Sequence, residues 1–164
     1  TLMTNIALEN RFADLAIPFV RSKVGDRYVL EMMQQHGWEL GGENSGHIVC
    51  LDRHTTGDGI VSALQVLAAL VREGRTLRHA TADLNMAVQV MRNVPISRSF
   101  DYRANPEVSA AIARAERELG DRGRLLIRAS GTEPVIRVMA ESVDAVLAKA
   151  VASQVSIAVA QAAG

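Results

Sequence analysis

Two short segments concentrate the residue types that bind anions and hydroxyl groups. Residues 128–134 read Arg-Ala-Ser-Gly-Thr-Glu-Pro and lie between apolar runs. They offer a guanidinium, two hydroxyls and several backbone N–H groups, and Gly131 permits unusual dihedral angles. Such a loop can form a concave nest of donors for a phosphate, to which Arg128 would add bidentate contacts. A hairpin turn in which Ser130 and Thr132 bond to their own backbone explains the same residues equally well.

The second segment, residues 41–47, reads Gly-Gly-Glu-Asn-Ser-Gly-His. Its glycines allow the backbone to turn and to approach a ligand closely. If Glu43 and Ser45 are extended, their side chains point the same way, because strand side chains alternate. A carboxylate beside a hydroxyl suits neighbouring sugar hydroxyls, or a hydroxyl and an ammonium. The alternative is an ordinary surface turn before a strand, and His47 alone is more typical of a strand end than of a ligand.

Two further polar segments have simpler interpretations. Residues 21–28 carry three cations before an expected helix, whose N-terminus favours anions. A solvated strand end with Asp26 as the helix cap is the better interpretation. Residues 55–59, Thr-Thr-Gly-Asp-Gly, hold too few carboxylates for a metal loop and predict a helix start. The histidines lack zinc spacing, so we predict no metal site in this chain.

Composition narrows the classes of partner. The 164 residues carry 18 basic and 18 acidic side chains, and this zero net charge argues against a generic nucleic-acid or anionic-membrane binder. Cys50 is the only cysteine, so no intrachain disulfide can form and a reducing cytoplasm is the simplest location. We see no signal peptide, and no apolar run that approaches the roughly 18 residues needed to span a bilayer.

Apolar spacing and end signals predict an α/β first half and a small α+β second half. The alternation of strands and helices in the first half suggests part of a parallel sheet layer. The boundary falls near residues 83–87, which gives domains 1–85 and 86–164. Helices are expected to begin near Asn5, Asp26, Ile60, Asn105 and Ser142, with a shorter one over 77–84 and an apolar stripe of Ile60, Leu64, Leu67 and Val71 on the third. Strands are expected over 18–24, 47–51, 88–96, 125–128 and 135–140.

Four segments together resemble the α-D-phosphohexomutase family. Residues 23–29, 42–47, 55–61 and 128–134 match family motifs in the family's order and approximate spacing. One such motif would be weak evidence, whereas four in order across most of the chain are strong evidence. The sequence Glu-Asn-Ser-Gly-His at residues 43–47 favours the glucosamine branch of the family.

The resemblance implies four domains around a cleft, of which this chain holds most of the α/β third, without its opening helix and strand, and the whole α+β fourth. Domain 1–85 would then bind the sugar and domain 86–164 the phosphate. Sugar hydroxyls would bind at Glu43 and Ser45, and the substrate phosphate at Arg128, Ser130, Gly131 and Thr132, with help from Arg137. By the same resemblance Lys23 and His47 face the reacting sugar as assisting groups, and no other catalytic group lies in this chain.

The family's phosphoserine and its Asp-rich magnesium loop have no counterpart here. The resemblance therefore implies that the N-terminal domains of the same polypeptide supply catalysis and hold Mg²⁺, while this chain alone is inactive. The intact enzyme would be an isomerase of amino sugar metabolism that interconverts hexosamine 6-phosphate and 1-phosphate through a phosphoserine and a bisphosphate. The alternatives are the same chemistry on mannose or glucose phosphates, or a non-catalytic module that binds phosphosugars.

Overall fold

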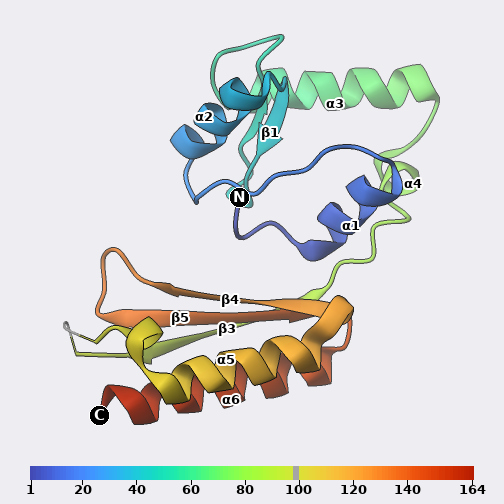
Figure 1. Cartoon of the computed structure of the whole chain (residues 1–164). Helices are drawn as coiled ribbons and strands as arrows, with labels where there is room; N and C mark the ends of the chain where they lie inside the picture. Colours follow the sequence, from blue (N-terminus) through green and yellow to red (C-terminus); the bar gives the residue numbers. More distant parts are fainter. Residues whose placement is uncertain (98–99) are drawn as a thin grey trace. The chain divides into compact units, whose positions relative to one another are not determined.

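The computed structural model describes residues 1–97 and 100–164, which form two compact units (Figure 1). Unit 1 comprises Thr1–Thr4 and Leu8–Leu84, and unit 2 comprises Asn5–Ala7 and Asn85–Gly164. The chain therefore passes between the units three times. The assignment of 1–85 to sugar binding and 86–164 to phosphate binding stays a prediction.

Unit 1 holds helices around a short hairpin. Its strands pair antiparallel, with Gly41 opposite Val49, so the parallel layer expected from the sequence is wrong for the described residues. Residues 18–24 form no strand. Their backbone accepts a hydrogen bond from Leu2 N–H at the Ser22 carbonyl, which is not enough to form a ladder of strand hydrogen bonds. The elements are α1 Ile6–Asp14, α2 Asp26–His36, β1 Leu40–Gly42, β2 Ile48–Cys50, α3 Gly59–Glu73 and α4 Leu77–Ala80.

A small apolar core joins α2 to the hairpin. Val29 and Met33 on α2 and Val49 on β2 are buried against one another. Strand β1 lies so close to α2 that a Cβ on Gly41 would come within 2.8 Å of a Val29 methyl carbon and nearer still to the Met33 sulfur. Gly41 therefore allows the close packing of β1 on α2.

The ends of the helices in unit 1 test the capping predictions. Asp58 caps α3 by accepting from the N–H groups of Ile60 and Val61 at 2.8 and 3.0 Å, as the sequence predicts. These two backbone hydrogen bonds lower the pKa of Asp58, and the bond from Val61 contributes most. The cap predicted at Asp26 is wrong, because Gly25 is the N-cap of α2 and no side chain caps it. The stripe predicted on α3 is solvent-exposed: Ile60, Leu64, Leu67 and Val71.

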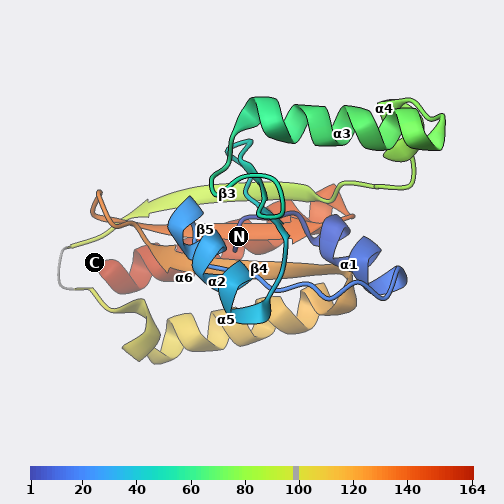
Figure 2. The same cartoon turned by 90° about the horizontal axis from the view of Figure 1, so that it is seen from above.

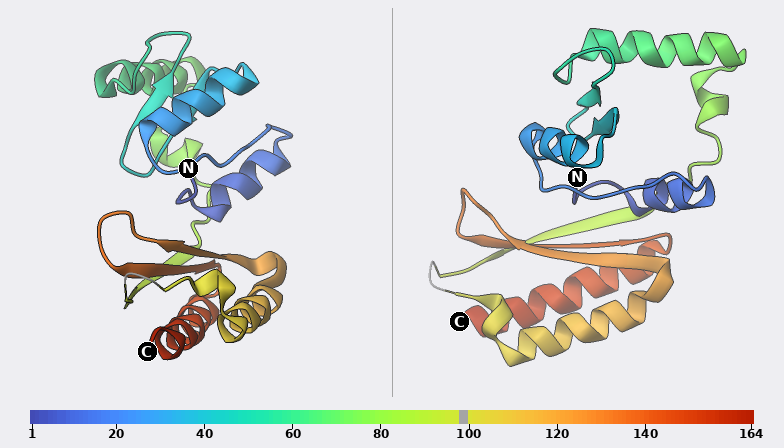
Figure 3. Two further views of the ribbon diagram at one scale, coloured as in Figure 1. Left: turned by 60° about the vertical axis from the view of Figure 1, so that its left-hand side comes forward. Right: turned by 45° about the horizontal axis from the view of Figure 1, so that its top comes forward.

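Unit 2 is a three-stranded antiparallel sheet with two helices packed on one face (Figures 2 and 3). The strand order is β3-β5-β4, so β5 is the central strand. Asn105 caps α5, and Pro106 opens it, as the sequence predicts. The elements are β3 Val88–Pro95, a 3₁₀ turn Tyr102–Ala104, α5 Pro106–Leu119, a second 3₁₀ turn Gly120–Arg122, β4 Gly123–Ala129, β5 Val135–Ser142 and α6 Ala145–Ala163.

The last helix, α6, forms much of the core of unit 2. Val151, Val155 and Val159 are fully buried and pack with Ile136 and Val138 of β5. By length and composition alone, α6 could also cross a membrane, which is weak evidence for a span. The helix packs against β3 and β5, and core helices of soluble proteins pass the same test.

Candidate functional site

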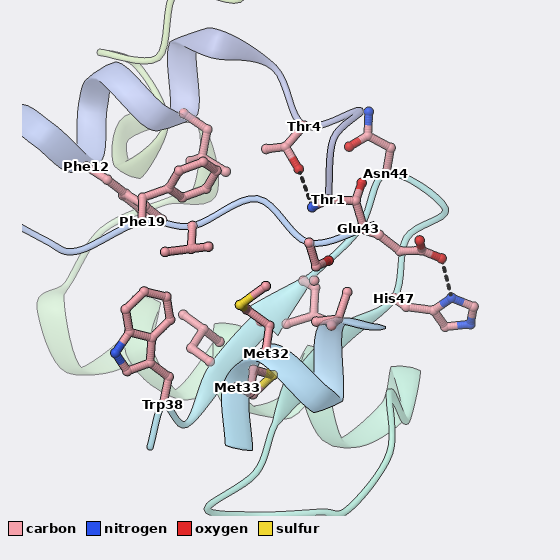
Figure 4. A pocket seen from close by; sticks show the side chains of 18 of the residues that line it. Thr1, Thr4, Phe12, Phe19, Met32, Met33, Trp38, Glu43, Asn44 and His47 are labelled. Atoms are coloured by element: carbon pink, nitrogen blue, oxygen red, sulfur yellow. Dashed lines mark hydrogen bonds and ion pairs between the residues drawn. The ribbon is translucent and has the colours of Figure 1, made fainter. Parts of the chain in front are cut away.

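Residues 43–47 form a turn between β1 and β2 that gathers the side chains of Glu43, Ser45 and His47; Figure 4 shows Glu43 and His47. The segment is not extended as expected: Gly46 N–H donates to the Glu43 carbonyl, and Gly46 takes φ 95°. Even so, the side chains meet. Ser45 Oγ donates to Glu43 Oε1 at 2.7 Å and lies 2.9 Å from His47 Nδ1.

Glu43 is the carboxylate at the centre of this turn. Its side chain is 12% exposed, and its Oε2 accepts from Gly25 N–H at 3.1 Å. The hydrogen bond from Ser45 is the main reason that the pKa of Glu43 lies below its ordinary value; burial opposes the shift, and the Gly25 bond adds to it. Glu43 is therefore a charged acceptor at neutral pH.

The imidazole of His47 lies between acceptors and a glycine. Its Nδ1 is 3.3 Å from Asp26 Oδ1 and 3.6 Å from Glu43 Oε1. A Cβ on Gly57 would come 3.3 to 3.6 Å from His47 Cβ, Cδ2 and Cγ, so the Gly57 backbone closely approaches the ring. The side chain is nevertheless 48% exposed, which leaves part of the ring open to a ligand.

The three cations around the start of α2 do not form one anion site. Arg21 pairs with Glu9 at 2.7 Å, and Arg27 pairs with Glu31 within α2 at the same distance. Lys23 is exposed, and its ammonium lies 5.5 Å from the centre of the Tyr28 ring. Of these cations, Lys23 is thus the one without an ion pair among the described residues.

Unit 1 also contains an apolar cavity of about 360 Å³ beside this turn (Figure 4). Phe12, Phe19, Met33 and Trp38 line it, with Glu43 and His47 at its edge. The walls are mostly apolar and so offer few of the hydrogen-bond partners that a sugar phosphate needs. The polar turn, and not the cavity, is therefore the candidate sugar site.

Asp26, Glu43 and His47 each place one metal-ligating atom within 4.8 Å of the others. This set does not fit Mg²⁺, which prefers oxygen ligands in octahedral geometry, because one of the three donors is an imidazole nitrogen and Glu43 already accepts from Ser45 and Gly25. Among the described residues, this cluster therefore does not form a magnesium site.

The second candidate site is the hairpin loop between β4 and β5. Ser130 Oγ accepts from the N–H groups of Thr132 and Glu133 at 3.5 and 3.3 Å, which is the local bonding that the turn interpretation predicts. Both bonds are long and therefore weak. Because these two N–H groups bond to Ser130 Oγ, the structure shows the turn, and the nest of donors for a phosphate stays a prediction.

Two arginines flank this loop. Arg128 and Arg137 are Cα partners across β4 and β5, so their side chains start on the same face of the sheet. Arg137 Nη2 pairs with Glu133 Oε2 at 3.0 Å, and Arg137 Nε is buried without a hydrogen-bond partner in the described structure. Arg128 forms no ion pair within the described residues. The two guanidiniums provide the positive charge that a dianion requires.

Gly131 and Thr132 lie at the exposed tip of this loop. Gly131 does not take a positive φ. A Cβ added there would meet no atom within 4 Å. The roles of both residues stay predictions.

Three residues of these sites were not singled out from the sequence as site residues. Asp26 was assigned to helix capping, Gly57 to a helix start, and Glu133 received no role. The spacing of Asp26 from His47 carries no periodic signal, because the two come together only when α2 packs on the hairpin. Glu133 could have been noticed, since it precedes Arg137 by four residues across a turn.

Comparison with known proteins identifies the class. Residues 1–87 match the phosphoglucomutase/phosphomannomutase alpha/beta/alpha domain III, and residues 91–158 match the C-terminal domain of the same family. The chain therefore belongs to the phosphoglucomutase/phosphomannomutase family, in agreement with the α/β and α+β units and with the resemblance seen in the sequence.

Within this family the chain is similar to bacterial phosphoglucosamine mutases. It is 54% identical to that of Janthinobacterium sp. (strain Marseille) over 95% of this chain and 35% of the relative. It is 58% identical to that of Aromatoleum aromaticum over 88% of this chain and 32% of the relative. The chain thus spans about a third of the length of the curated relatives that it matches.

Solved structures give the same fold. N-acetylphosphoglucosamine mutase of Aspergillus fumigatus matches with a TM-score of 0.81 at 22% identity, over 98% of this chain and 37% of that chain. A structure of the same fungal enzyme in complex with GlcNAc-6P and magnesium matches with a TM-score of 0.73 at 21% identity, over 96% of this chain and 37% of that chain. At this identity the likeness supports the fold alone.

Proposed function

We propose that the whole protein is a phosphoglucosamine mutase, an isomerase that interconverts glucosamine 6-phosphate and glucosamine 1-phosphate. The observation that carries the proposal is the pairing of Arg128 and Arg137 at a loop rich in N–H donors. Two guanidiniums side by side are unfavourable unless an anion lies between them. The names of the bacterial relatives at 54% and 58% identity support the choice of sugar.

In this proposal the chain recognises the substrate and the rest of the polypeptide transfers the phosphoryl group. Arg128, Ser130, Gly131, Thr132 and Arg137 hold the substrate phosphate. A phosphoserine elsewhere in the protein donates its phosphoryl group and later recovers one from the other end of the bisphosphate intermediate. Positioning and electrostatics dominate phosphoryl transfer, and this loop supplies part of both.

Glu43 and Ser45 bind the sugar and not the phosphate. A carboxylate accepts from hydroxyl or ammonium groups but repels a dianion, and the pKa of Glu43 keeps it charged. Lys23 and His47 assist at the reacting hydroxyl. The N-terminal domains would hold Mg²⁺, which would supply charge neutralisation at the transferred group; the magnesium in the fungal structure supports this requirement. The proposal includes a cytoplasmic location and a role in making amino sugars for the cell wall.

The test is an assay of the intact protein with glucosamine, mannose and glucose phosphates, Mg²⁺ and a catalytic amount of the matching bisphosphate. Glucosamine 6-phosphate should give the highest kcat/KM, and Glu43→Gln should change the preference between glucosamine and glucose phosphates more than the affinity for inorganic phosphate. Equal losses for all ligands would contradict the sugar role of Glu43. Binding without turnover of any substrate would favour the non-catalytic alternative.

The 164-residue chain alone should be inactive, because neither Ser45 nor Ser130 has the surroundings of a phosphoryl carrier. Ser45 donates to Glu43, and Ser130 accepts from its own loop. The purified chain should show no turnover above that of a mock purification. Turnover that Ser45→Ala or Ser130→Ala abolishes would overturn this division of roles.

A further inference from the structure

Asp26 presents a carboxylate that helix capping does not use. Although it is the first residue of α2, the N-cap is Gly25 and no side-chain capping bond forms. Asp26 Oδ1 is buried, has no hydrogen-bond partner among the described residues, and lies 3.3 Å from His47 Nδ1. The oxygen is thus placed to accept from the imidazole, at a distance slightly longer than that of an ordinary bond.

The bonds around His47 determine which ring nitrogen carries the proton. Glu43 is charged, so it accepts the bond that joins it to Ser45 at 2.7 Å. A serine hydroxyl has one proton, and this bond uses it. Ser45 Oγ must therefore accept at its 2.9 Å contact with His47 Nδ1. The acceptors around Nδ1 favour a proton there, which leaves Nε2 as the unprotonated nitrogen of the neutral ring.

We propose that Asp26 is a positioning residue that holds His47 in the Nδ1-protonated tautomer, so that Nε2 faces the reacting sugar hydroxyl. The inference rests on the proposed function, which places His47 at the sugar. Ser45 fixes the hydrogen-bond direction, and Gly57 supports the ring. Asp26 adds the carboxylate that lies closest to Nδ1, closer than Glu43 at 3.6 Å.

This arrangement has a defined chemical use. As the sugar hydroxyl oxygen bonds to phosphorus and the bond from phosphorus to the serine oxygen breaks, the hydroxyl proton passes to Nε2. The proton then goes to the sugar oxygen at the other end of the bisphosphate, when the bond from that oxygen to phosphorus breaks and its phosphoryl group is transferred to the serine. His47 is positively charged between these steps, and the Asp26 carboxylate beside Nδ1 stabilises that charge.

The direct test is ¹⁵N–¹H correlation spectroscopy of the histidine rings in the 164-residue chain, at a pH where the imidazoles are neutral. His47 should show a protonated Nδ1 and an unprotonated Nε2. Asp26→Asn, which keeps the shape of the side chain, and Asp26→Ala should both lower the Nδ1-protonated fraction. Asp14→Ala, at an exposed position of α1, is the matched control and should leave it unchanged. An unchanged tautomer in both Asp26 variants overturns the proposal.

Kinetics of the intact protein give the second readout. Asp26→Asn should lower kcat by about 10-fold, a part of the roughly 10²–10⁴-fold that acid–base catalysis contributes, while KM changes by less than about 2-fold because Asp26 does not touch the sugar. Loss of kcat without a change of tautomer would show a merely structural role and overturn the inference. If the native protein turns over no sugar phosphate, the proposed function fails while the spectra still decide the role of Asp26.

Discussion

Arg128 and Arg137 are direct partners across strands β4 and β5 of unit 2. Like charges directly opposite each other destabilise an antiparallel pair. Arg137 is partly compensated by Glu133, with a contact of 3.0 Å, whereas Arg128 has no such pair among the described residues. This cost to the sheet is understandable if the pair exists to bind an anion.

Arg128→Gln should therefore have opposite effects on stability and binding. The free energy of unfolding of unit 2 should rise by a few tenths to about 1 kcal/mol, because a like-charge pair is removed. Affinity for glucosamine 6-phosphate should fall at least ~10-fold, since a charge-assisted hydrogen bond is worth roughly 1.5–3 kcal/mol. Urea unfolding measures the free energy of unfolding, and calorimetric titration measures the affinity. Lower stability with unchanged affinity would remove Arg128 from the site.

Glu133→Gln should strengthen phosphate binding. Glu133 now occupies Arg137 Nη2, and its side chain is 57% exposed. Exposed pairs are worth about 0.2–1 kcal/mol, so freeing Arg137 should raise the affinity for inorganic phosphate by up to roughly 5-fold. Titration of the chain with phosphate tests this expectation, with the exposed α5 variant Glu116→Gln as control. Weaker binding in Glu133→Gln would mean that Glu133 orders the loop and does not compete with the ligand.

Gly131→Ala separates ligand approach from loop stability. Gly131 has no positive φ, and an added Cβ meets nothing within 4 Å, so stability should stay within about 0.5 kcal/mol. The methyl group should nevertheless obstruct a bound phosphate and weaken its affinity. Gly120→Ala is the matched comparison: at φ 48° it should destabilise unit 2 by more than about 1 kcal/mol. Unchanged affinity in Gly131→Ala would place the phosphate away from the loop tip.

Acid should destabilise unit 1 partly through Glu43. Its folded pKa is lowered from an ordinary value of 4.5, mainly by the bond from Ser45. A carboxyl group with a depressed folded pKa contributes stability above its unfolded pKa, and this contribution disappears as the pH falls through the folded value. Stability should therefore decline below about pH 4.5, and Glu43→Gln should reduce that slope. A parallel pH profile in Glu43→Gln would show that other groups cause the acid sensitivity.

The structure confirms two helix starts that were predicted from local sequence signals. Asp58 and Asn105 cap α3 and α5, since capping depends only on the next three residues. Asp26 has the same signature but faces His47, because packing of α2 on the hairpin competes with the cap. The exposed stripe on α3 shows that helical spacing predicts the helix but not what covers it.

The candidate sites were predictable as segments but not as arrangements. The sequence placed Glu43 near Ser45, yet it assumed extended backbone where the chain turns. The position of Arg137 opposite Arg128 depends on strand register, which a single sequence does not reveal. The antiparallel pairing of β1 with β2 likewise depends on partners that alternation alone cannot identify.

A buried carboxylate joins the start of α1 to the sheet of unit 2. Glu141 on β5 is fully buried and accepts from Arg124 Nε at 2.6 Å, from Ile6 N–H at 2.8 Å and from Gln89 Nε2 at 3.0 Å. Beside it, the Asn5 side chain bonds to both the N–H and the carbonyl of Ala87, at 3.1 and 2.9 Å. Residues 5–7 are thus held to unit 2 by side chains and not by a strand ladder.

Glu141→Ala should therefore destabilise unit 2 strongly, because it leaves a guanidinium and an N–H group without their buried acceptor. Removing one partner of a buried pair typically costs about 3–5 kcal/mol. Glu141→Gln keeps the shape and one acceptor, so it should cost less, while Glu118→Ala on the exposed side of α5 serves as control. Hydrogen exchange gives the local readout: the Ile6 amide should lose its protection in Glu141→Ala. If Ile6 stays protected while the unfolding free energy falls, residues 5–7 are held by contacts other than Glu141.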